Sequence, residues 1–152
     1  SDMHITVLSI ISCHDGFSLS QINPSAYIAV IEENLIHLKN LEINLNGITA
    51  SNSTIMIQGF PTNESLNSFR DSLRKAFKKT NLEQSIDSRY TLFTAHISVC
   101  RFRKPIADTT KLVSLLEKYR NEDFGRFAVN QLELVYNDWY QRKEKTQFLT
   151  HE

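Results

Sequence analysis

Nearly the same four residues occur twice in this chain, as HITV at residues 4–7 and as HISV at residues 96–99. Each copy lies in a run of apolar, β-branched residues that is typical of a buried strand. Along a strand, side chains two positions apart share a face, so each copy predicts one face with a histidine and a hydroxyl and an opposite face in the core. The repeat therefore predicts two equivalent strands whose polar faces form one four-residue site.

The first copy begins a regular order of elements. A strand over residues 4–12 is followed by a helix that starts at Pro24 with Asn23 as its cap. Residues 41–50 and 54–60 then alternate between apolar and polar side chains around a short polar turn, which predicts a hairpin.

The second copy repeats this order. A strand over residues 92–102 precedes a helix capped by Asp108 or Thr109, and two more strands are predicted over 127–139 and 146–150. The duplicated order predicts an α+β fold, bilobal and pseudo-two-fold, in which antiparallel sheets form a central groove flanked by helices.

All 152 residues are expected to form one domain, with lobes over about 1–62 and 82–152. A helix over 63–80 joins the lobes, and its apolar residues recur at helical spacing. Its other surface is crowded with basic residues, which we expect to be a solvated face: Arg70, Arg74, Lys75, Lys78 and Lys79.

Charge limits the partners of the chain. The 17 Lys and Arg residues balance the 17 Asp and Glu residues, so no overall positive field favours a long nucleic-acid duplex. A nucleotide ligand would have to be bound locally, which favours a small molecule or a single-stranded end.

The two cysteines and the hydropathy favour a cytoplasmic protein. Cys13 and Cys100 have no metal-ligand spacing and fit a reduced intracellular protein better than a disulfide framework. No apolar run approaches the roughly 20 residues that span a bilayer, so no membrane partner is expected.

Several catalytic classes fit the repeated motif poorly. Two histidines with hydroxyl neighbours provide no third or fourth metal ligand, so no metal is expected. A Gly-x-Ser-x-Gly elbow is missing from the sequence, and so are a Walker loop and a dinucleotide fingerprint. No cofactor is therefore expected.

A symmetric pair of imidazoles suits acid-base chemistry across one phosphorus atom. One histidine accepts a proton from the attacking oxygen while the other donates a proton to the leaving oxygen, and the near-neutral pKa of histidine suits both tasks. Hydroxyls two residues on can donate hydrogen bonds to the nonbridging oxygens as negative charge shifts in the transition state.

In its two repeated motifs the chain resembles the two-histidine (2H) phosphoesterase superfamily, which includes LigT-like 2'-5' RNA ligases and cyclic phosphodiesterases. The hallmark of that family is a pair of His-x-Thr/Ser motifs on central strands of a bilobal α+β fold. His4 with Thr6 and His96 with Ser98 match both motifs, and Arg101 matches the arginine that many members carry after the second. Family members usually place a strand and a helix before the first motif, so we expect that lead-in to be missing here.

The resemblance implies a hydrolase that cleaves RNA-type phosphodiesters, either 2',3'-cyclic phosphates or 2'-5' linkages such as those of 2'-5' oligoadenylate. His96 is assigned provisionally as the base and His4 as the acid, with the reverse left open. Thr6 and Ser98 would hold the phosphate. Arg101 lies one residue out of phase with His96 on an ideal strand, so it needs a bulge or a strand end to reach the phosphate.

Base binding would need an aromatic platform, for which Tyr136, Trp139 and Tyr140 are the candidates, with Tyr90 or Phe93 as others. The expected partners are RNA ends, 2'-5' oligonucleotides or cyclic nucleotides, bound by a monomer. The alternative is a catalytically silent RNA- or nucleotide-binding module with the same fold. A third possibility is a domain of a larger protein that degrades signalling 2'-5' oligoadenylates.

Overall fold

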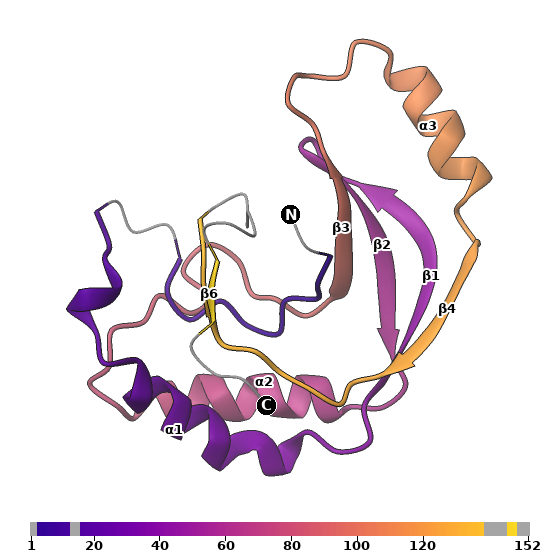
Figure 1. Ribbon diagram of the computed structural model, residues 1–152. Coiled ribbons are helices and arrows are strands. Elements are labelled where there is room, and N and C mark those ends of the chain that lie inside the picture. The colour runs from indigo at the N-terminus through magenta and orange to yellow at the C-terminus, as the bar shows by residue number, and fades with distance from the viewer. Residues whose placement is uncertain (1–2, 13–15, 139–145, 149–152) are drawn as a thin grey trace.

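The computed structural model describes residues 3–12, 16–138 and 146–148 (Figure 1). Within them the chain is α+β, as predicted, with antiparallel sheets. The α-helices are α1 (Pro24–Asn34), α2 (Ser65–Lys78) and α3 (Thr109–Lys118), and short 3-10 turns lie at Leu19–Gln21 and Leu35–His37. The strands are β1 (Glu42–Ala50), β2 (Thr54–Pro61), β3 (Ala95–Arg101), β4 (Asp123–Ala128), β5 (Val135–Tyr136) and β6 (Gln147–Phe148).

Local signals fix the helix starts. Pro24 occupies the first turn of α1, and the side chain of Asn23 accepts a hydrogen bond from the backbone N–H of Ser25. The side chain of Asp108 accepts one from the backbone N–H of Lys111 and so caps α3. Both predicted caps are confirmed, with Asp108 as the second.

The larger sheet has the strand order β3-β2-β1-β4. Its centre is the predicted hairpin of β1 and β2, and β3 and β4 add antiparallel strands at the two edges. The sheet therefore combines strands from residues 1–62 with strands from 82–152. The predicted boundary between the lobes does not separate these four strands. A smaller sheet pairs β5 with β6.

Gly47 lies where the register of β1 against β2 shifts by one residue. Its φ is +72°, and a Cβ atom at this position would collide with the carbonyl oxygen of Arg120. The loop after α3 thus packs directly on the β1 backbone, where the N–H of Gly47 donates to the carbonyl of Glu122.

The prediction of a strand over residues 4–12 is wrong. Ile5 forms a single antiparallel bridge with Ile97, and the rest of the segment is in no ladder. The carbonyls of Thr6 and Val7 accept hydrogen bonds from the Arg70 side chain instead, and the carbonyl of Ile10 accepts one from the backbone N–H of Ser85. The apolar run therefore marks a buried extended segment whose polar groups are satisfied outside a sheet.

The prediction of one long strand over residues 127–139 is also wrong. β4 ends at Ala128, and regular pairing resumes only for Val135 and Tyr136. The alternating residues between them pack on two different cores, Val129 on one and Leu132 and Leu134 on the other. Val129 is out of phase with Leu132 and Leu134, so the stretch is an extended crossing between the two cores and not one strand. Of the predicted strand over 146–150, β6 covers Gln147–Phe148, and the last two residues lie outside the described part.

Helix α2 belongs to both cores. Phe69, Leu73 and Phe77 form the first core with Tyr27 of α1, and the N-terminal segment packs over it. Leu66, one turn earlier, joins the second core beneath the sheet, whose other buried members are Leu41, Ile43 and Ala95. Figure 1 shows α1 and α2 side by side, with the sheet rising at one end of α2.

The basic surface of α2 is only partly solvated. Lys75, Lys78 and Lys79 are exposed, as expected, but Arg70 is fully buried and the side chain of Arg74 is only 11% exposed. The prediction was wrong for both arginines because each binds carbonyl or carboxylate oxygens of other segments. Among the described residues, none of the helices has the length and apolar composition to cross a bilayer.

Candidate active site

The bridge between Ile5 and Ile97 brings the two motifs together. In an antiparallel pair, the residues before and after one bridged position lie opposite those after and before the other. His4 therefore comes opposite Ser98, and Thr6 comes opposite His96. All four lie on the same face, because Ile5 and Ile97 point to the other side.

The apolar side of this arrangement is anchored in the core. Ala95 is buried, and Ile5 and Val7 pack against the cluster that contains it. Alternation then directs the intervening polar side chains away from that core. His96 and Ser98 are half-buried, Thr6 is half-buried, and His4 is exposed.

The ladder between β2 and β3 sets the position of the second motif. His96 is paired with Gln58, Ile97 with Ile57, and Ser98 with Met56. Gly59 allows close contact at the start of β3, since a Cβ atom there would lie 3.2 Å from the Cβ of Ala95. The second motif is thus fixed by regular backbone pairing.

A β-bulge at Val99 changes the phase of β3. Ser98 is paired with Met56 and Cys100 with the next residue, Ile55, so β3 has one extra residue at this point. After the bulge, Arg101 returns to the face that carries His96 and Ser98. The bulge that Arg101 needs to share this face is therefore present. The positive charge of Arg101 contributes to lowering the pKa of His96.

The first motif is held by Arg70 of α2. The Nε of this side chain donates to the carbonyl of Val7 at 2.7 Å, and Nη2 donates to the carbonyls of Thr6 at 3.1 Å and Thr94 at 2.9 Å. One guanidinium thus binds the backbone of both motif-bearing segments. Its burial could have been recognised from the spacing of residues, because Arg70 falls on the apolar stripe of α2, four residues after Leu66 and seven before Phe77.

The electrostatic environment of His96 favours its neutral form. Burial lowers the pKa of His96 below its usual range, and the positive charges of Arg70, His4 and Arg101 lower the pKa further. A neutral imidazole can accept a proton, so His96 is suited to act as a base at neutral pH.

Three of the aromatic residues predicted as base platforms lie in the described part of the chain. Tyr136 packs on Phe17, with ring centroids 6.0 Å apart, and its hydroxyl donates to the Phe17 carbonyl at 3.4 Å. Trp139 and Tyr140 lie outside the described residues, as does Cys13. Phe93, three residues before His96, is 67% exposed, and the guanidinium of Arg74 lies 5.6 Å from its ring centroid. Tyr90 is also largely exposed.

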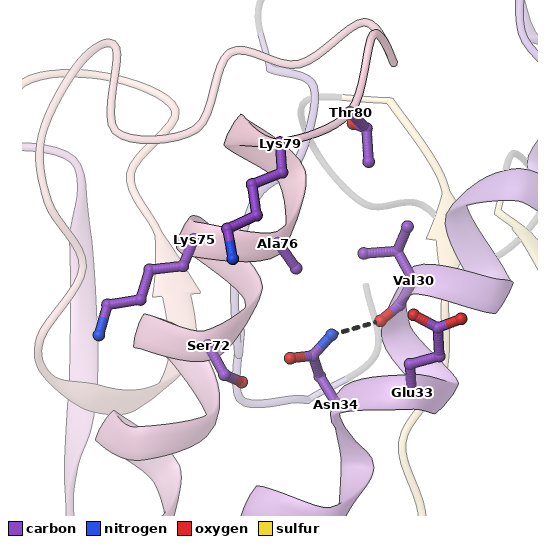
Figure 2. A pocket seen from close by; sticks show the side chains of 8 residues that line it. All are labelled: Val30, Glu33, Asn34, Ser72, Lys75, Ala76, Lys79 and Thr80. Carbon is purple, nitrogen blue, oxygen red and sulfur yellow. Dashed lines mark hydrogen bonds between the residues drawn. The ribbon is translucent and has the colours of Figure 1, made fainter.

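Two hollows in the described part of the chain lie next to α1, α2 and the N-terminal segment. The larger, of about 440 Å³, lies between α1 and α2 and is lined by none of the predicted site residues (Figure 2). Lys75 of α2 and Lys79, the residue after α2, line it together with Glu33 and Asn34 of α1. The smaller, of about 90 Å³, lies between residues 8–12, which follow the first motif, and residues 85–92, which precede the second.

Cys100 on β3 is a free, exposed thiol. Within the described residues, no three of the His, Cys, Asp and Glu side chains gather as they would around a metal ion.

Comparisons of the chain with protein-family models, with curated proteins and with solved structures found no match.

Proposed function

We propose that the chain is a metal-independent phosphodiesterase of the two-histidine type, acting on RNA-type phosphodiesters. The observation that carries this proposal is the antiparallel bridge between Ile5 and Ile97. A local two-fold axis through such a pair relates the residue before one bridged position to the residue before the other. It relates the two residues after the bridged positions in the same way. His4 then corresponds to His96, and Thr6 to Ser98.

The finer architecture proposed with this function is bilobal and pseudo-two-fold, with the motifs in a groove between the lobes. Two cores support it, one between α1, α2 and the N-terminal segment and one beneath the sheet. The bridge lies where the segment from the first core meets the edge strand of the second.

The proposed reaction uses one histidine on each side of the phosphorus. For a 2',3'-cyclic phosphate, His96 accepts a proton from water as the water oxygen bonds to phosphorus, and His4 gives a proton to the ribose oxygen that leaves. For a 2'-5' linkage, the attacking group is the neighbouring ribose hydroxyl, and the leaving group is the 5' oxygen. The lowered pKa of His96 supports the base assignment, because a base must be neutral before the reaction.

Charge and hydrogen bonds would stabilise the phosphate. Thr6 and Ser98 provide one hydroxyl from each motif for the nonbridging oxygens. Arg101 adds a positive charge on the same face after the Val99 bulge. Exposed Phe93 is the best-placed candidate for stacking a base, since it is three residues from His96 and outside the core.

A substrate panel tests this function. The chain is incubated in EDTA with nucleoside 2',3'-cyclic phosphates, 2'-5' and 3'-5' oligoadenylates and an ADP-ribose cyclic phosphate, and the products are identified by mass. We expect turnover of a cyclic or 2'-5' substrate and none in a variant that carries both His4→Gln and His96→Gln. Tight binding of a 2'-5' oligoadenylate or a nucleoside 2'-phosphate without turnover would instead select the silent binding module.

A further inference from the structure

Arg70 contacts both segments that carry the motifs. It is 0% exposed, and its guanidinium binds the carbonyls of Thr6 and Val7 on one side and of Thr94 on the other, over 2.7 to 3.1 Å. Thr6 is a motif residue, and Thr94 precedes His96 by two positions. A single side chain from α2 therefore fixes the spacing of two segments far apart in the sequence.

This burial is costly for a charged group. Burial, together with a smaller contribution from the nearby charge of Arg74, lowers the pKa of Arg70 to about 10. Among the described residues no carboxylate forms an ion pair with Arg70, and its partners are carbonyl dipoles together with Oδ1 of Asn67 at 3.5 Å. Stability alone would favour an apolar side chain of similar volume on this stripe of α2.

We propose that Arg70 is a positioning residue that holds the first motif beside β3 and maintains a positive charge close to His96. This proposal rests on the proposed function and adds a role for a residue outside the two motifs. The planar fork of arginine suits the geometric part, because its donors point in fixed directions toward several carbonyls at once. Its permanent charge suits the electrostatic part.

The groups that act on His96 come from three elements. Arg70 lies on α2, His4 on the N-terminal segment and Arg101 on β3 itself, and the cross-strand neighbour from β2 is the uncharged Gln58. Since His4 and Arg101 belong to the motifs, Arg70 is the charge that can be removed without changing a motif residue. Burial remains the largest cause of the lowered pKa, so its removal should restore only part of the shift.

Two substitutions separate the two parts of the role. Arg70→Gln removes the charge and keeps a single amide donor, whereas Arg70→Lys keeps the charge and loses the fork. The matched control is Arg74→Met, one turn further along α2. Arg74 binds Asp87 at 2.8 Å, Asp71 at 2.9 Å and the Leu92 carbonyl at 3.0 Å, but it is not among the charges that act on His96.

The first measurement is an NMR titration of the His96 imidazole without substrate, with hydrogen exchange of the amides of residues 5–8. We expect the His96 midpoint to rise in Arg70→Gln and to stay near the wild-type value in Arg70→Lys and Arg74→Met. Exchange at residues 5–8 should be at least about tenfold faster in both Arg70 variants and little changed in the control. An unmoved midpoint in Arg70→Gln, or an equal rise in Arg74→Met, would overturn the electrostatic part.

The second measurement is kcat/KM against pH on the substrate found by the panel. The acid limb should move to higher pH in Arg70→Gln and stay in place in Arg70→Lys, with kcat reduced at least about tenfold in both. If Arg70→Gln does not fold, Arg70→Lys tests the geometric part of the role. Wild-type hydrogen exchange and wild-type turnover in Arg70→Lys would refute the proposed positioning by Arg70. If the wild-type protein turns over none of the substrates, the proposed function is rejected. The substrate-free titration of His96 still tests the role of Arg70 in that case.

Discussion

The two copies of the motif are nearly identical in sequence and differ in how the molecule holds them. The HISV copy belongs to β3, where every residue from His96 to Ser98 is paired with β2. The HITV copy has one backbone bridge, two carbonyls bound by the Arg70 side chain, and the packing of Ile5 and Val7 against the core. His96 is half-buried and His4 is exposed.

In the proposed mechanism, this difference gives two nearly identical motifs two different chemical roles. A histidine with a partly desolvated ring surrounded by positive charge favours the neutral form, and His96 is in that position. An exposed histidine remains accessible to a leaving group and to solvent protons. We infer that the environments, and not the motifs, divide the work between base and acid.

The largest expected effect comes from removing either imidazole. His96→Gln and His4→Gln should each lower kcat by about 10²- to 10⁴-fold, the usual range for a general acid or base. Both side chains lie outside the buried cores, so the folded state should persist by circular dichroism. Wild-type turnover in either single variant would remove that histidine from the mechanism.

The hydroxyls should come next. Ser98→Ala and Thr6→Val each remove one donor to the phosphate and should lower kcat by about 10²-fold, with a smaller change in KM. Val is close to Thr in shape, and Ser98 lies in a regular ladder, so neither substitution should alter the fold. A rise in KM with kcat unchanged would assign the hydroxyl to uniform binding of substrate.

A third prediction compares the two backbones directly. Because β3 is paired with β2 except at the Val99 bulge and residues 5–10 are held by side chains and single contacts, amides 5–10 should exchange at least about tenfold faster than amides 95–101. Native-state hydrogen exchange with mass spectrometry measures this. Equal protection in both segments would mean that the first motif is held as firmly as the second.

The smallest effect concerns stability and pH. The pKa of His96 is lower in the folded state than the roughly 6.5 of an unfolded chain, so the unfolded state binds more protons as the pH falls. The free energy of unfolding should therefore decrease below about pH 6.5 and level off below the folded pKa. Denaturant titrations from pH 7.5 to 4.5 should find a shallower decrease in His96→Gln than in the wild type.

Elements set by local chemistry could be predicted from the sequence. The Asn23 and Asp108 caps, the proline at the start of α1 and the alternation in β1 and β2 act within a few residues, and the structure confirms them. The same locality explains the prediction that Arg101 would need a bulge, because it requires only counting residues along a strand.

The errors arose where long-range contacts decide the outcome. The N-terminal apolar run predicts a strand, but two of its carbonyls, those of Thr6 and Val7, accept hydrogen bonds from Arg70, more than sixty residues later. The prediction of one strand after β4 overlooks that Val129 and Leu132 are an odd number of residues apart, and the two residues pack on different cores. Arg70 was assigned to the solvated face because a basic residue on a helix is usually exposed.

The pH dependence of kcat/KM in His4→Gln, measured in EDTA, tests the division between base and acid most directly. If His96 is the base and His4 the acid, this variant should be slow, keep an acid limb below about pH 6.5 and lose the alkaline limb of the wild-type bell. The complementary loss of the acid limb, with the alkaline limb retained, would contradict the assignment and reverse the two roles.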